Sequence, residues 1–145
     1  MTDDMMPHPT VAEVARSRWL VFFRTDETQE AIAERLALIQ GATHKPLDLV
    51  DSLSWYDERF AACGGWDSWA LEAVTGKNYR SREPYFHGFI LTGEGCVGRG
   101  TAKVVSLALD LRKSVYWLSD GKLKPVANVE AAEDSWRILT RGTPL

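Results

Sequence analysis

One short segment concentrates glycine just before a run of residues typical of a helix. Residues 91–105 read LTGEGCVGRGTAKVV, with Gly93, Gly95, Gly98 and Gly100 in close succession. The N–H groups at the start of a helix have no partner within the helix, and glycine lets a ligand approach them closely. Arg99 adds a forked cation and Thr101 a hydroxyl or a helix cap. These residue types at this spacing predict a phosphate-binding loop.

The segment differs from two better-defined phosphate loops. It lacks the Gly-Lys-Ser/Thr of a Walker loop, and although Gly93, Gly95 and Gly98 match G-x-G-x-x-G, no acidic residue closes the next strand as a ribose partner. Asp120 is the nearest approximation, and Glu94 within the loop is the other acid able to contact a ribose. The plainer alternative is that Gly93 and Gly95 only let the chain leave a strand.

Hydrophobic patterning supplies the elements that must position these residues. A helix is expected after a cap at Asp26, with its end near Gly41. Further helices are expected over residues 52–62, 66–75, 101–111 and 130–139, and strands over residues 18–24, 85–91, 114–118 and 122–129. We therefore predict an α/β fold: a small single-domain, Rossmann-like three-layer sandwich with a mostly parallel sheet of three or four strands. The domain is expected to span residues 11–145 after a flexible tail, residues 1–10.

The expected topology selects a site before any motif is considered. In open parallel sheets, ligands bind beyond the carboxyl ends of the strands. That edge is expected to carry Arg24, Thr25 and Asp26, then residues 92–101, and finally Asp120. We expect the phosphate near residues 98–101, and residues 24–26 on the opposite wall.

The order GRGTA, helix, strand, written RGTAKVVSLALDLRKSVYWL, carries a family resemblance. It resembles the Rossmann-like nucleotide-recognising group that contains the SLOG sensors, the lysine-decarboxylase-like phosphoribohydrolases and the nucleoside deoxyribosyltransferases. The resemblance covers residues 85–120 and implies a nucleotide-like ligand. Where enzymes of that group place a catalytic glutamate, this chain has Lys103, Val104 and Val105, which favours binding over catalysis. If the protein is an enzyme, Glu94 or Asp120 is the carboxylate available for cleavage or transfer at an N-glycosidic bond.

Composition narrows the class of partner. Residues 1–72 carry 6 basic and 13 acidic side chains and residues 73–145 carry 11 and 7, so a net charge of −3 divides into −7 and +4. The basic second half suits an anionic ligand, whereas the acidic whole argues against broad nucleic-acid binding. Cys63 and Cys96 have no metal-ligand spacing, and no long apolar run is present, so we expect a cytoplasmic protein with no metal, cofactor or membrane contact.

Aromatic residues leave a third function open. Trp55, Trp66 and Trp69 with Tyr56 fit a wall against a base, a packed core or a dimer surface. The apolar residues spread round residues 101–111 are likewise compatible with burial or with a homo-oligomer. A protein-interaction or inhibitor module of a phage or mobile element, with the glycine segment only a turn, therefore stands beside the binding and enzyme hypotheses.

Overall fold

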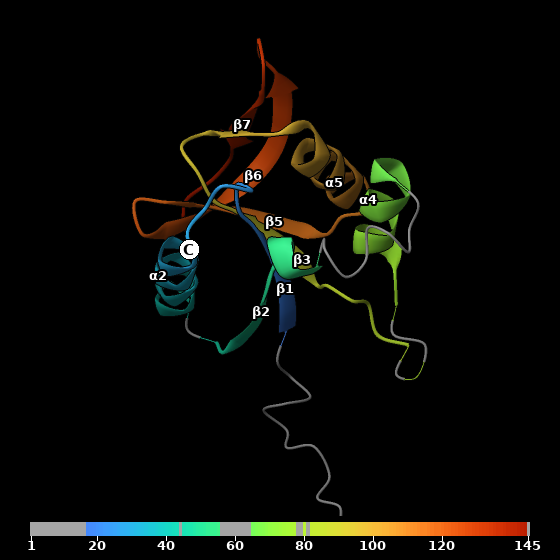
Figure 1. Cartoon of the computed structure of the whole chain (residues 1–145), viewed down its shortest axis with the longest axis horizontal. Coiled ribbons are helices and arrows are strands. Elements are labelled where there is room, and N and C mark those ends of the chain that lie inside the picture. Colours follow the sequence, from blue (N-terminus) through green and yellow to red (C-terminus); the bar gives the residue numbers. More distant parts are fainter. Residues whose placement is uncertain (1–16, 44, 56–64, 78–79, 81, 145) are drawn as a thin grey trace, which may run out of the picture.

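The computed structural model describes residues 17–43, 45–55, 65–77, 80 and 82–144 (Figure 1). The expected tail at residues 1–10, the end of the helix expected over residues 52–62, Tyr56 and Cys63 lie outside this part. Residues 52–55 are helical, as expected for the start of that helix. No helix among the described residues is long and apolar enough to cross a membrane.

A single seven-stranded sheet organises the fold, in the order β2-β1-β3-β5-β6-β7-β4. Its strands are β1 (Ser17–Phe22), β2 (Leu47–Asp51), β3 (Gly88–Leu91), β4 (Cys96–Val97), β5 (Ser114–Ser119), β6 (Lys122–Ala131) and β7 (Trp136–Thr140). β2, β1, β3 and β5 are parallel, while β6, β7 and β4 join by antiparallel pairing. The prediction of a Rossmann-like three-layer sandwich with three or four mostly parallel strands is therefore wrong: the sheet is larger, and three of its six pairings are antiparallel.

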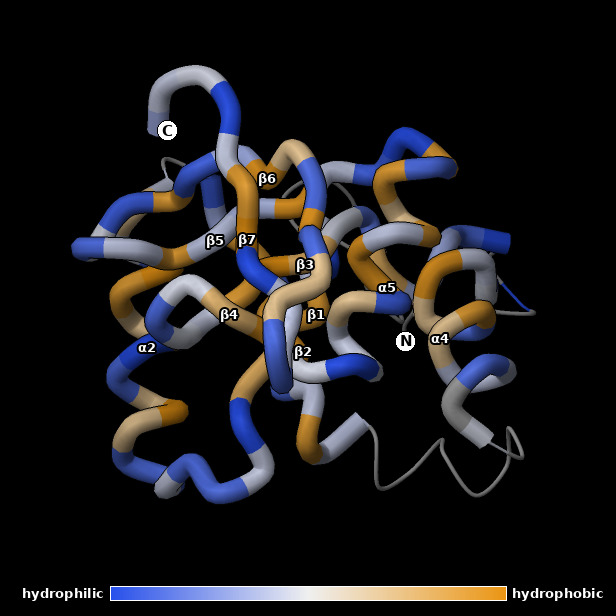
Figure 2. Tube along the Cα trace, turned by 90° about the horizontal axis from the view of Figure 1, so that it is seen from above, coloured by the Kyte–Doolittle hydropathy of each residue, from blue (hydrophilic) through white to orange (hydrophobic). Residues whose placement is uncertain are grey.

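The apolar alternation of β1 explains how helices come to cover the sheet. Val21 and Phe23 pack toward α2 (Gln29–Gly41), whereas Leu20 and Phe22 pack toward α4 (Trp66–Thr75) and α5 (Arg99–Asp110). In Figure 1, α2 accordingly lies apart from α4 and α5. Figure 2 shows hydrophobic segments gathered where the strands and α5 meet, with hydrophilic segments toward the rim.

Three strands were not predicted by the pattern: β2, β4 and β7. Residues 130–139 were expected to be helical, but β6 continues to Ala131 and Trp136 begins β7. Pairing of β7 with both β6 and β4 satisfies main-chain groups along two neighbours, and this outweighs the local helical spacing. β2 was missed because the alternation of its leucines is weak, and its residues are only half-buried.

The strand connections create a topological switch between β1 and β3. From β1 the chain passes through α2 to β2 on one side, whereas from β3 it passes through α5 to β5 on the other. Ligands of open parallel sheets bind at the carboxyl ends of strands at such a point. The loops that follow β1 and β3 flank this switch point.

Candidate functional site

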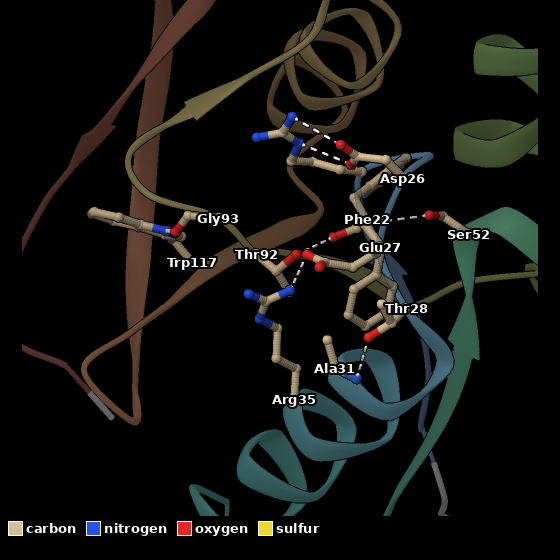
Figure 3. Close-up of polar contacts among 12 residues, drawn as sticks. Phe22, Asp26, Glu27, Thr28, Ala31, Arg35, Ser52, Thr92, Gly93 and Trp117 are labelled. Carbon is tan, nitrogen blue, oxygen red and sulfur yellow. Dashed lines mark hydrogen bonds and ion pairs between the residues drawn. The ribbon is translucent and has the colours of Figure 1, made fainter.

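Two buried hydroxyl groups hold the carboxyl ends of the parallel strands together. The Thr92 hydroxyl donates to the Phe22 carbonyl oxygen at 2.6 Å, and the Ser52 hydroxyl accepts from the Phe23 N–H at 3.1 Å. Thr92 follows β3, Phe22 ends β1 and Ser52 follows β2, so these bonds tie three strand ends to one another (Figure 3). Thr92 is 8% exposed and Ser52 4% exposed, so water does not compete for these bonds. The edge is thus a firm base for the loops beyond it.

The loop after β1 carries Arg24, Thr25 and Asp26, all exposed. Arg24 Nε lies 3.2 Å from Asp26 Oδ1, with side chains 77% and 69% exposed, so the two charges satisfy each other in solvent. Asp26 is not the helix cap: Thr28 caps α2, its hydroxyl accepting from the Ala31 N–H at 3.1 Å. The helix cap therefore lies two residues later than the one expected at Asp26.

The first half of the glycine segment is anchored to the far edge of the sheet. Gly93 and Gly95 have φ of 110° and 107°, a region that favours glycine. The bends that they allow bring β4 onto β7: Val97 pairs with Trp136, and the Gly95 carbonyl oxygen accepts from the Ile138 N–H at 2.8 Å. These two glycines thus have a structural reason, in agreement with the plainer alternative. Glu94 lies exposed between them.

The second half begins α5 and leaves its first N–H groups without a side-chain cap. Gly98 is the N-cap residue, and the first helical bond runs from the Ala102 N–H to the Gly98 carbonyl oxygen at 2.9 Å. The N–H groups of Arg99, Gly100 and Thr101 therefore precede the helical ladder, and α5 begins two residues before the start expected at residue 101. Thr101 is the third helical residue rather than the cap.

Charged side chains surround the first turns of α5. The Arg99 side chain is exposed and makes no hydrogen bond or ion pair within the described part of the chain. Lys103 forms an ion pair with Asp67 of α4. The hydrogen bond and charge of Lys103, and to a smaller extent the charge of Arg99, lower the pKa of the Asp67 carboxyl. The positive charge of Lys103 is therefore paired with the carboxylate of Asp67 on the neighbouring helix.

Asp120 lies at the carboxyl end of β5 but serves a turn. With φ of 54° at Asp120 and 72° at Gly121, the two residues connect Ser119 and Lys122, which pair across the β5–β6 hairpin. Aspartate followed by glycine is favoured where both central residues of a hairpin turn need positive φ. The Asp120 side chain remains exposed.

The predicted site residues thus lie on the expected loops without forming one bonded cluster. Residues 24–26, the start of α5 and Asp120 are not linked by any hydrogen bond or ion pair among the described residues. Nor do three acidic, histidine or cysteine side chains of that part come together to hold a metal ion.

The aromatic residues of the middle of the chain pack inward. Trp69 is 2% exposed, and its ring lies 5.4 Å from that of Trp55, which also contacts Phe86 at 5.1 Å between ring centroids. Core packing therefore accounts for Trp55 and Trp69, and neither supports the hypothesis of a wall against a base.

Two hollows were not expected from the sequence. A groove of about 540 Å³ follows α5, with Leu71 of α4 and Trp136 of β7 among its lining residues. A smaller hollow of about 250 Å³ lies near the C-terminal end of α5 and is lined in part by Arg112, Lys113 and Arg141. Burial, with the charge of Lys77, lowers the pKa of Lys113. Since a tertiary pairing brings Trp136 to α5, the spacing of residues along the chain held no signal for the groove.

No family model matches the chain, and neither a curated protein nor a solved structure matches it significantly.

Proposed function

We propose that this protein binds a small phosphorylated ligand, a nucleotide or a nucleotide-derived molecule, at the carboxyl ends of its parallel strands. The observation that carries the proposal is the start of α5: three consecutive N–H groups without a side-chain cap, beside an exposed arginine that has no partner in the described part of the chain. Such a start attracts anions through its N–H groups and through the helix dipole.

The roles of the surrounding residues follow from their positions. The N–H groups of Arg99, Gly100 and Thr101 hold a phosphate, and the Arg99 guanidinium engages two of its oxygens. Glu94 or Asp120 contacts a ribose hydroxyl, since both carboxylates are exposed on loops at this edge. Arg24, Thr25 and Asp26 form the opposite wall, across the switch between β1 and β3. The resemblance to nucleotide-recognising domains agrees with this ligand class.

Binding is favoured over catalysis by the state of residue 103. Lys103, which is paired with Asp67, stands at the position where enzymes of the group that this chain resembles carry an acid. An ammonium group cannot attack an anomeric carbon as a carboxylate does. Asp67 is itself held charged by that lysine, as its lowered pKa indicates. We therefore propose that the protein binds this ligand and does not act on it as an enzyme.

Calorimetric titration with nucleoside mono-, di- and triphosphates and with pyrophosphate tests the proposal. A charged hydrogen bond contributes about 1.5–3 kcal/mol, so Arg99→Ala should weaken binding by about tenfold or more. Arg141→Ala is the matched control. Arg141 is also exposed and without an ion pair among the described residues, but it follows the last residue of β7 and does not belong to the start of α5. Mass spectrometry of the same mixtures distinguishes a binder, which returns the nucleotide unchanged, from an enzyme, which releases the base. Absence of heat with every ligand would refute the proposal.

A further inference from the structure

The groove along α5 has an apolar side that the proposed phosphate site does not use. Leu71 of α4 is 52% exposed at its border, a large fraction for a leucine, and Leu107 and Trp136 are half-buried in its lining. Small residues, Ala102 and Ser106, line it between these larger side chains. A partner that covers this groove would remove apolar surface from water and could approach α5 closely at the small residues.

Opposite charges stand at the two ends of the same helix face. Arg99 begins α5 and Asp110 ends it, and both line the groove. Their separation of eleven residues is about three helical turns, so they lie on one side of the helix. Neither side chain has a hydrogen bond or ion pair within the described part of the chain. Lys103 lies between them and is already paired with Asp67.

This arrangement of charge is complementary to itself. When two such helices lie antiparallel about a two-fold axis, residue 99 of each stands opposite residue 110 of the other, and residue 103 stands opposite residue 106. We propose that the groove is the contact surface for a second copy of this chain, with Arg99 paired to Asp110 of the partner subunit. The two-fold axis repeats this ion pair, and Ser106 beside the axis leaves room for close approach.

The size of the surface sets the expected strength. A contact confined to one helix, one leucine of α4 and one tryptophan of β7 is smaller than a standard interface, so the dimer is expected to be weak and to dissociate on dilution. The proposal does not rest on ligand binding. It shares Arg99 with the phosphate site, so the test must separate the two.

Sedimentation velocity of the full chain, from low-micromolar to submillimolar concentration, provides the test. The wild type should pass from monomer to dimer. Arg99→Asp and Asp110→Arg should each weaken the dimer by about tenfold or more, because each substitution places like charges together at both repeats of the pair. The double variant R99D/D110R restores opposite charges and should recover the dimer. A wild type that stays monomeric, or a double variant that stays as weak as the single ones, would overturn the proposal.

Two leucine variants give an independent measurement that does not touch Arg99. Leu71→Asp should weaken the dimer, whereas Leu38→Asp, a substitution of a leucine 45% exposed on α2, should leave it unchanged. Equal effects of both substitutions would also overturn the proposal. Pyrophosphate titration of R99D/D110R separates the two proposals: this variant should dimerise but bind pyrophosphate weakly. A monomeric wild type that binds pyrophosphate would leave the proposed ligand site standing, and a dimer without pyrophosphate binding would leave the contact surface standing.

Discussion

Replacement of Gly98 by aspartate is expected to raise the stability of α5 and to lower the affinity of the proposed phosphate site. Its φ of −78° and ψ of 175° suit any N-cap residue, and a Cβ added there meets no atom within 4 Å. Aspartate at this position can accept from the N–H of Gly100 or Thr101 and places a negative charge at the positive end of the helix dipole. The same carboxylate stands where we propose that the phosphate binds.

The stability gain can be summed from three sources. Replacing a glycine cap by aspartate contributes a few tenths of a kcal/mol, the charge at the helix start about 0.3–1, and the loss of glycine from the unfolded chain about 0.4–1. The total for Gly98→Asp is about 1–2 kcal/mol, which for a chain of 145 residues corresponds to a rise in Tm of about 3–6 °C. Binding of a phosphorylated ligand should fall by tenfold or more, because two anions compete for the same N–H groups.

Thermal denaturation and calorimetric titration of three variants complete the experiment. Gly98→Ala adds no acceptor and no charge, and alanine is a poorer N-cap residue than glycine, so this loss should offset the unfolded-state gain of about 0.4–1 kcal/mol. The variant should therefore change little in stability and keep its affinity. Gly98→Asn caps the helix without charge and should lie between the other two. If Gly98→Asp is stabilised and binds the ligands as tightly as the wild type, the phosphate does not bind at the start of α5. If it is destabilised, the description of Gly98 as an open cap is wrong.

Two further predictions concern the elements that hold the site. Ser52→Ala leaves the buried Phe23 N–H without its acceptor and should cost about 1–3 kcal/mol in thermal denaturation; a loss below about 0.5 kcal/mol, the range of most surface changes, would contradict this. Gly88→Ala places a Cβ 2.1 Å from a ring carbon of Trp19, so the indole must move, and the variant should lose about 1–3 kcal/mol and change its near-ultraviolet circular dichroism. Gly41→Ala is the control: it lies at the end of α2 and its Cβ meets nothing within 4 Å, so it should lose no stability and leave the circular dichroism unchanged.

The parts of the fold that could be predicted are those whose signal is local. The apolar face of α5 requires burial wherever the helix lies, and Ala102, Val104, Val105 and Ala108 are all buried. The Asp120–Gly121 pair likewise predicts a hairpin turn, because only a few residues adopt positive φ readily. These features depend only on residues that lie close together in the sequence, so a single sequence is enough to predict them.

The parts that failed depend on partners far away in the chain. Val97 pairs with Trp136 across nearly forty positions, and this pairing fixes both β4 and β7. Nothing within residues 130–139 indicates that partner, so their helical spacing was misleading. The antiparallel half of the sheet depends on the same long-range pairing. For this reason the prediction of a small, mostly parallel Rossmann-like sheet was wrong.

The glycine segment shows how one stretch of sequence serves two ends. Gly93 and Gly95 have backbone angles that other residues rarely adopt, and they fasten the segment to β7. Gly98 has no such requirement, since its φ is ordinary and the space beside it is open. Folding would therefore tolerate, and helix capping would favour, a polar side chain at that position. What glycine provides there is a helix start whose N–H groups no side chain occupies, and an anion is the ligand that such a start binds best.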